Sequence, residues 1–227
     1  CMTYPEIGNY GINAEDIESK SIQVGGFICK NVCPYPSNHR KSNMTLSEYL
    51  DKNGIPGIYD IDTRKLVRIL RDSGAMRGVV LTGDISAEEA IAKAKAIPSI
   101  VGADLAQVVT RSTTDTWNEL PHPLQPSSFT NETERFKVVA VDFGVKYNTL
   151  RRIQDLGAEI TVVPAQTTAE EILAHNPDGV YLSNGPGDPE AVTYGIEMVK
   201  GLIGKVPVFG ICLGHQILSL AMGAETF

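Results

Sequence analysis

Apolar runs alternate with mixed segments along the chain after Phe136. Four runs rich in β-branched residues predict buried strands over residues 137–142, 159–164, 179–183 and 206–211. Apolar residues at helical spacing predict helices over about 148–156 and 192–202, and a capping box from Thr168 to Glu171 starts another. Strands that alternate with helices through short loops are typical of a parallel, doubly wound α/β sheet. The last run is almost wholly apolar, and a buried strand of this kind needs a neighbour on each side, so we expect a sheet that ends on it to be unfinished.

Residues 1–110 have a less regular pattern, which predicts a mixed α/β domain. Strands are expected over 21–29 and 76–81, and helices over 64–71, after a capping box from Thr45 to Glu48, and after a second one from Ser86 to Glu89. Residues 111–135 contain three prolines, many small polar residues and few aliphatic ones. That composition predicts an interdomain linker, so the second domain is expected to span 136–227.

Cys212 stands at the corner between the last predicted strand and the helical pattern that follows it. Gly210 and Gly214 flank it, which is the layout of a nucleophile elbow. The amides at the start of the following helix would favour a thiolate, the nucleophilic form of cysteine. A cysteine in an apolar stretch is more often a small buried hydrophobe. The two glycines and the strand-to-helix context favour the nucleophile here.

A second loop, with the sequence Asn-Gly-Pro-Gly-Asp-Pro at residues 184–189, follows the third predicted strand. Ligands of such sheets bind beyond the carboxyl ends of the strands, so this loop and Cys212 are expected at one edge. Glycines around a proline give a rigid turn with exposed amides, which suit an oxyanion. An ordinary turn is the alternative. No Gly-Lys-Ser or Gly-Lys-Thr follows, which excludes a P-loop.

Composition narrows the possible partners. The chain has 227 residues, of which 42% are hydrophobic and 21% charged, as in ordinary soluble proteins. A net charge of -7 argues against nucleic acid and anionic membranes as partners. Four scattered cysteines fit a reducing, cytoplasmic location, or an organelle in a eukaryote. Cys29 and Cys33 lack the further ligands of a zinc site, so we expect no metal.

Three sets of motifs carry a resemblance to a known family. The elbow, Gly-Ile-Cys-Leu-Gly-His-Gln at 210–216, together with the 184–189 loop, resembles the class I glutamine amidotransferases. The segment Asp-Phe-Gly-Val-Lys-Tyr-Asn at 142–148 is similar to the small, glutamine-hydrolysing subunits of carbamoyl phosphate synthetase. Segments 3–9, 36–40 and 60–64 resemble the amino-terminal domain of the same subunits. The resemblance covers essentially the whole chain.

The resemblance implies a glutaminase. Cys212 would attack the side-chain amide of glutamine to form a thioester, and the amides of Leu213 and Gly187 would hold the oxyanion. Gly185 and Gln216 match further glutamine-binding positions of the family. The ammonia would pass to a large subunit that makes carbamoyl phosphate with ATP and Mg²⁺, so no cofactor is expected on this chain. Whether the product serves arginine or pyrimidine synthesis stays open.

The general base of the resembling family is a histidine in a downstream Gly-His-Pro-Glu motif, which these 227 residues do not contain. We therefore expect a chain truncated at both ends and inactive by itself, with His215 structural. Three alternatives stay open: another class I amidotransferase, a cysteine hydrolase of the same topology, and a non-catalytic fragment that binds its partner. A basic helical face is expected toward the partner or toward solvent: Arg64, Lys65, Arg68 and Arg71.

Overall fold

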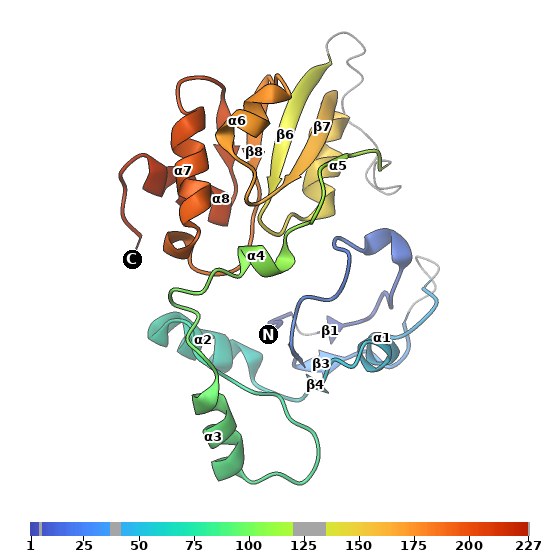
Figure 1. Cartoon of the computed structure of the whole chain (residues 1–227). Helices are drawn as coiled ribbons and strands as arrows, with labels where there is room; N and C mark the ends of the chain where they lie inside the picture. Colours follow the sequence, from blue (N-terminus) through green and yellow to red (C-terminus); the bar gives the residue numbers. More distant parts are fainter. Residues whose placement is uncertain (5, 37–41, 120–134, 227) are drawn as a thin grey trace. The chain divides into compact units, whose positions relative to one another are not determined.

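The computed structural model describes residues 1–4, 6–36, 42–119 and 135–226 (Figure 1). The chain divides into two compact units, unit 1 over Cys1–Ser99 and unit 2 over Ile100–Phe227. None of the helices in the described residues has the length and apolar character needed to cross a bilayer.

Unit 1 consists of short elements. In chain order these are β1 (Glu6–Ile7), η1 (Ala14–Asp16), β2 (Phe27–Ile28), β3 (Asn31–Val32), α1 (Leu46–Lys52), β4 (Gly57–Ile58), α2 (Thr63–Ser73) and α3 (Ala87–Ala96). Strand β1 pairs with β3 and β2 with β4, both parallel. The three predicted helices are confirmed, and Thr45 and Glu48 form the predicted capping box. Of the predicted 21–29 strand, only β2 forms.

The strand predicted over 76–81 is wrong, since the described residues there form no strand. The segment finds no partner strand, and β propensity alone does not form one. Its Arg77 instead donates to the carbonyls of Lys95 and Ile97 at 2.9 and 3.0 Å, where α3 ends. The cation therefore satisfies carbonyl groups that a helix end leaves unpaired.

Unit 2 is built on a five-stranded sheet of order β5-β7-β6-β8-β9. Strands β6 (Phe136–Asp142), β7 (Ala158–Pro164), β8 (Gly179–Leu182) and β9 (Val208–Gly210) are parallel, and β5 (Asp115–Thr116) is antiparallel to β7. The helical elements are α4 (Ala106–Val109), α5 (Tyr147–Asp155), α6 (Ala169–Ala174), η3 (Pro189–Ala191), α7 (Thr193–Leu202) and α8 (Leu213–Ala221). The predicted α/β fold with a parallel sheet is confirmed.

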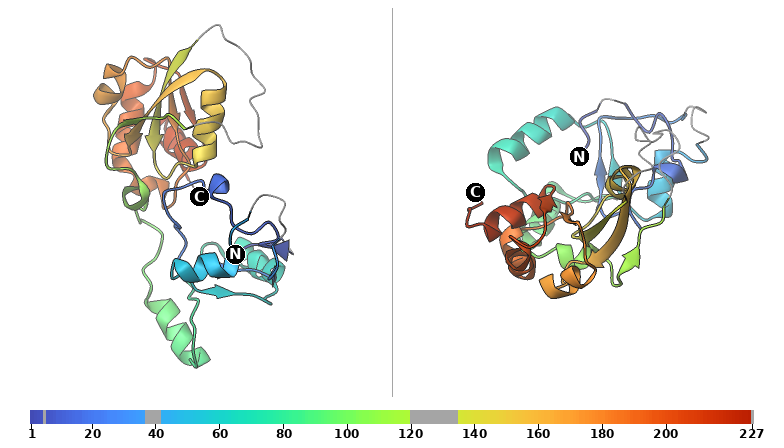
Figure 2. Two further views of the ribbon diagram at one scale, coloured as in Figure 1. Left: turned by 90° about the vertical axis from the view of Figure 1, so that its right-hand side faces the viewer. Right: turned by 90° about the horizontal axis from the view of Figure 1, so that it is seen from above.

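Helices cover both faces of this sheet, with α5 on one side and α6 to α8 on the other (Figures 1 and 2). Alternate residues of β6 enter two separate cores. Val139 and Val141 pack with α6, α7 and α8, whereas Val138 and Ala140 pack with Leu150 of α5. This two-residue period is the expected signature of a strand with two buried faces.

The first residues of the expected linker, 111–135, belong to the sheet and core of unit 2. Its residues Asp115 and Thr116 form β5, and Trp117 is buried against the ring of Tyr147, with centroids 5.2 Å apart. The observed division between the units, after Ser99, also comes earlier than the expected domain boundary at 110. The cause is that the segment after Ile100 bonds to the strand ends of unit 2. Residues 120–134 lie outside the described part.

The last strand, β9, has a neighbour on one side only within the described residues, and that neighbour is β8. The Phe209 side chain is 64% exposed, although it stacks on Tyr181 with centroids 6.4 Å apart. The apolar character of the run therefore does not place it between two strands here.

Candidate functional site

Cys212 occupies a strained turn between β9 and α8. Its backbone has φ 52° and ψ -113°, a combination that residues other than glycine rarely adopt. Gly210 and Gly214 make the turn possible, because a Cβ on Gly214 would overlap the carbonyl oxygen of Leu182 and lie 2.6 Å from its carbon. Cys212 is exposed and free of disulfide bonds. Strain, flanking glycines and exposure together are the features of a nucleophile elbow.

The first turn of α8 supplies amides beside this sulfur. Gly214 N–H donates to the Ser183 carbonyl at 3.1 Å and to the Ile211 carbonyl at 3.0 Å. The Leu213 N–H donates to no acceptor within the described part of the chain. An unpaired first-turn amide and the helix dipole favour negative charge at this point.

The loop at 184–189 lies directly against the start of α8. A Cβ on Gly185 would overlap the carbonyl oxygen of Phe143 and lie 2.8 Å from Cδ2 of Leu213. Gly187 has φ +99°, which favours glycine, and its N–H has no acceptor within the described residues. Two unpaired amides, of Leu213 and Gly187, therefore lie in the elbow after β9 and in the loop that packs against it.

A third loop, after β6, holds the 184–189 loop in place. Ser183 is buried and accepts the Phe143 N–H at 2.9 Å, and the Asn184 side-chain amide donates to the Gly144 carbonyl at 2.8 Å. The buried Asp142 organises this third loop by accepting the amides of Gly144 and Val145, both at 2.9 Å. The switch point of the sheet, between β6 and β8, thus meets the elbow after β9.

The structure brings the five predicted site residues, Gly185, Gly187, Cys212, Leu213 and Gln216, to the carboxyl ends of β8 and β9. Gln216 is exposed one turn into α8, and its N–H donates to the Cys212 carbonyl at 3.0 Å. Sequence reasoning did not assign a role to Ser183 or Asp188. Asp142 was considered only as part of the 142–148 motif. The signal that could have indicated its role is an acidic residue at the end of a buried strand.

Two of the four histidines lie in the described residues. His175 follows α6 and precedes β8, so it lies near the amino end of that strand, whereas Cys212 lies beyond the carboxyl end of β9. His215 is exposed on α8, and no hydrogen bond joins it to the Cys212 sulfur within the described residues. The structural role expected for His215 stays a prediction, while His39 and His122 lie outside the described part.

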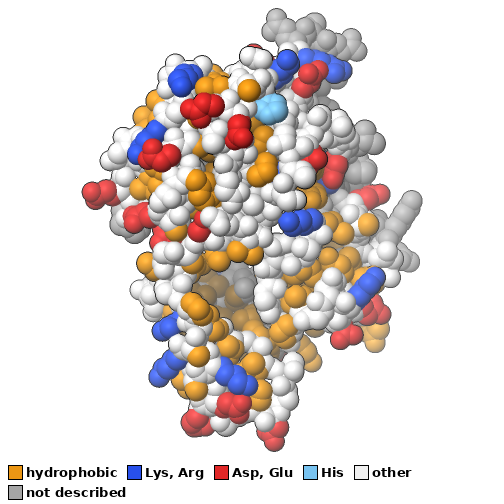
Figure 3. Space-filling model, viewed as in Figure 1, with side chains coloured by type: hydrophobic (Ala, Val, Ile, Leu, Met, Phe, Trp, Pro, Cys, Tyr) orange, Lys and Arg blue, Asp and Glu red, His pale blue; other side chains and the backbone are white. Residues whose placement is uncertain are grey.

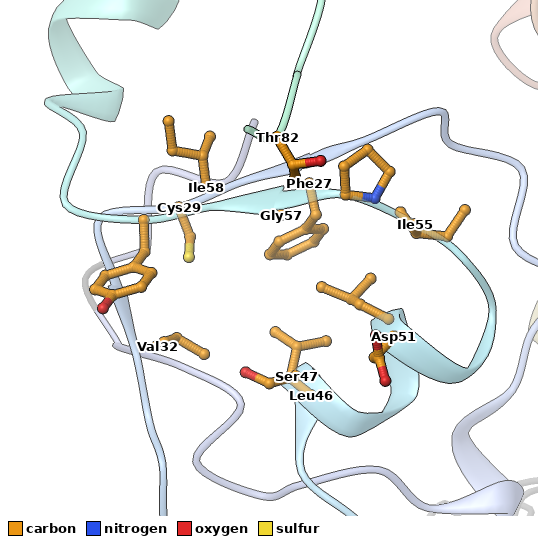
Figure 4. A pocket seen from close by; sticks show the side chains of 13 residues that line it. Phe27, Cys29, Val32, Leu46, Ser47, Asp51, Ile55, Gly57, Ile58 and Thr82 are labelled. Carbon is orange, nitrogen blue, oxygen red and sulfur yellow. The ribbon is translucent and has the colours of Figure 1, made fainter. Parts of the chain in front are cut away.

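Unit 1 contains a separate pocket of about 320 Å³ between α1, β2 and β4. Its lining is mainly apolar, and the Cys29 sulfur points into it (Figure 4). Burial raises the pKa of the Cys29 thiol, so the neutral thiol is the favoured form. A buried, neutral thiol is a poor nucleophile, which leaves Cys212 as the better candidate.

The predicted basic face forms on α2, where Arg64, Lys65, Arg68 and Arg71 are exposed. Val67 and Ile69 of the same helix are also exposed, and Figure 3 shows basic and hydrophobic side chains together in the region of α2. Whether this face meets a partner or solvent stays open. Among the described residues, no three His, Cys, Asp or Glu side chains are grouped so that they could hold a metal ion.

Comparisons with known proteins agree with this geometry. Residues 139–227 match the family described as glutamine amidotransferase class-I. Residues 1–80 match the carbamoyl-phosphate synthase small chain, CPSase domain. The carbamoyl phosphate synthase small chain of Syntrophotalea carbinolica is 52% identical over 227 residues, covering 100% of this chain and 60% of its own length.

The small chain of Vibrio cholerae is 50% identical over 230 residues, covering 99% of this chain and 60% of its own length. The small chain of Rhodopirellula baltica is 47% identical over 234 residues, with coverages of 100% and 60%. The chain therefore spans about 60% of the length of these curated relatives.

Proposed function

Because the chain belongs to the family of carbamoyl phosphate synthase small chains, with both of its domains matched, we propose that unit 2 hydrolyses glutamine through Cys212. The observation that supports this most strongly is the strained, exposed Cys212, which is followed by the unpaired amide of Leu213. A thiol at a helix start with an unpaired amide next to it suits attack on a carbonyl carbon, because the amide can hold the oxyanion.

In the proposed reaction, the Cys212 sulfur attacks the side-chain amide carbon of glutamine. The carbonyl oxygen becomes an oxyanion that accepts hydrogen bonds from the amides of Leu213 and Gly187. The carbon–nitrogen bond then breaks, the nitrogen takes the proton that the thiol has given up and leaves as ammonia, and a γ-glutamyl thioester remains. Water hydrolyses the thioester to glutamate and the free thiol. A donor of this kind contributes about 10²–10³ in rate.

Gly185 and Gln216 are proposed to contact the bound glutamine. A side chain at Gly185 would collide with the Phe143 carbonyl and the Leu213 side chain, so only glycine lets this loop lie so close to the start of α8. Gln216 projects from the same turn of α8 that follows the nucleophile, and it is exposed enough to reach a ligand.

Ammonia made in this way would serve a second active site. The family name supports a large-chain partner, which we propose binds ATP and Mg²⁺ and uses the ammonia to make carbamoyl phosphate. No cofactor is proposed on this chain.

Trapping of the thioester tests the proposal. Incubation of the full-length protein with carbon-labelled glutamine, followed by acid quenching, should leave label on the wild type and none on Cys212→Ser. Cys1→Ser, which removes another exposed thiol, is the matched control and should retain the label. Equal labelling of the wild type and Cys212→Ser would refute the assignment.

A further inference from the structure

Residues 102–111, here called the strap, run along the carboxyl ends of the strands in unit 2. Next to β8, the Gly102 N–H donates to Asp188 Oδ2 at 2.8 Å, and the Asp188 N–H donates to the Ala103 carbonyl at 3.1 Å. Asp188 also accepts the Glu190 N–H on its other carboxylate oxygen at 3.0 Å, which starts η3. One carboxylate therefore joins the strap, the 184–189 loop and η3.

The strap is bonded to two further strand ends. Its Thr110 hydroxyl accepts the Ala165 N–H at 2.9 Å, just after β7. Its last residue, Arg111, donates from its backbone amide to Asp142 at the end of β6, at 3.2 Å. Helix α4 belongs to the strap and lies at the lower end of the sheet in Figure 1. Fixation at three strand ends makes the strap a rigid support.

The strap backbone lies against Gly187. A Cβ placed on Gly187 would be 2.8 Å from the Ala103 carbonyl oxygen and 2.9 Å from the Leu105 nitrogen. Backbone atoms cannot move aside as a flexible side chain can, so the strap limits where the Gly187 peptide can lie. The position of the Gly187 N–H therefore depends on residues 103–105.

A second side-chain contact anchors the strap. The Tyr194 hydroxyl of α7 donates to Asp104 Oδ1 at 3.3 Å, and the same oxygen accepts the Gln107 N–H at 3.3 Å. Burial, followed by the nearby Asp104 carboxylate, raises the pKa of Tyr194, so its hydroxyl keeps its proton. The donor needed for this contact is thus present throughout the neutral range.

We propose that Asp188 and Asp104 are positioning residues, which hold the Gly187 amide at its place beside Cys212 through the strap. The inference rests on the proposed function, in which that amide stabilises the oxyanion. The support matters most where negative charge develops, so its loss lowers the rate of the chemical step more than it weakens glutamine binding. The strap directly follows unit 1 in the chain, so the segment that enters unit 2 is also the segment that supports the site.

The test combines turnover with hydrogen exchange in the whole protein. Asp188→Ala should speed amide exchange in peptides covering 184–190 and lower kcat by about 10- to 100-fold, with KM unchanged within about twofold. Asp178→Ala is the matched control. Asp178 also accepts a backbone N–H, that of Lys137, but it does so at the amino ends of the strands, away from the site. It should leave exchange at 184–190 and kcat unchanged.

The Asp104 variants provide a second, independent arm. Asp104→Ala should show the same pattern more weakly. Asp104→Asn keeps an acceptor oxygen for Tyr194 and should recover most of the wild-type kcat. This arm decides the question if Asp188→Ala does not fold.

Wild-type exchange and kcat in Asp188→Ala, a change in KM alone, or no recovery in Asp104→Asn would each overturn the proposal. A full-length wild-type protein that hydrolyses no glutamine would instead refute the proposed function. Exchange at 184–190 in Asp188→Ala would then decide by itself whether the strap holds the Gly187 loop.

Discussion

Gly210 and Gly214 meet across the turn that carries Cys212, so closely that a Cβ on Gly210 would lie 2.5 Å from the carbonyl carbon and oxygen of Gly214. Such a distance is too short for a carbon atom that is not bonded to its neighbour. The neighbouring atoms belong to the backbone of Gly214, so they cannot move aside as a flexible side chain can. The elbow therefore depends on the absence of side chains at both glycines, with the strain concentrated at Cys212.

Gly210→Ala is accordingly expected to displace the elbow. We predict a loss of about 1–3 kcal/mol in the free energy of unfolding, as for other insertions into packed sites. Gly179→Ala is the control, because its Cβ would meet only the Pro207 carbonyl, at an ordinary 3.8 Å. Urea unfolding measures both. Equal stability of the two variants would contradict the close approach at Gly210.

Asp142 is expected to contribute more to the free energy of unfolding than Asp115, the exposed carboxylate that binds the same arginine. The buried Asp142 carboxylate accepts two loop amides and the backbone and side-chain N–H groups of Arg111, whereas the largely exposed Asp115 shares the same guanidinium. Asp142→Asn should destabilise the protein by about 1–3 kcal/mol, because the amide nitrogen that replaces one carboxylate oxygen cannot accept the two N–H groups bound there.

Asp115→Asn should cost less than about 1 kcal/mol, the usual limit for an exposed pair. Urea unfolding of the two variants side by side checks the difference. Similar losses in both would show that burial of Asp142 adds nothing.

The two capping boxes predict a defined pH response. The Thr168 backbone amide and then its hydroxyl lower the pKa of Glu171 from 4.5, and Thr45 does the same for Glu48. Because the folded pKa is lowered, the contribution is present above pH 4.5 and is lost as the pH falls through the folded pKa. NMR titration should show the Glu171 pKa rising part of the way toward 4.5 in Thr168→Ala, because the hydroxyl contact is lost while the backbone amide remains. An unchanged Glu171 pKa in that variant would exclude the hydroxyl contact.

The cysteines should differ in their reaction with iodoacetamide at pH 8. Cys29 is 3% exposed and has a raised pKa, whereas Cys1 and Cys212 are exposed. A raised folded pKa means that neutral Cys29 stabilises the fold below the unfolded pKa and that this contribution is lost as the pH rises further. Peptide mapping should find Cys1 and Cys212 modified before Cys29, and all of them at equal rates in urea. Early modification of Cys29 in the native protein would contradict its burial.

The sheet and the elbow could be predicted from the sequence because each rests on a local pattern. Two-residue alternation in β6 reflects its two buried faces, and the spacing of Gly210, Cys212 and Gly214 reflects the steric limits of the turn. The loop at 184–189 was predictable for the same reason, since the positive φ of Gly187 requires a glycine.

The contacts that support the site depend on long-range pairings without a local signature. Asp188 and Gly102 are far apart in the sequence, and neither residue indicates the other. Strand β5 was missed because its two residues gain their structure from pairing with β7, inside a segment whose composition suggests a linker. Strand β9 shows the opposite case, in which the apolar run alone indicated a strand with an open side, and one neighbour is present among the described residues.

Covalent labelling of Cys212 by a chloroketone analogue of glutamine is the most direct test of the account. It requires the nucleophile and the glutamine pocket, but no turnover. The account predicts one equivalent of label, located on Cys212 by peptide mass mapping, with labelling slowed by free glutamine and absent in Cys212→Ser. Label on Cys1 or Cys33 instead, or labelling of Cys212 that glutamine does not slow, would contradict the claim that Cys212 is the nucleophile of a glutamine site.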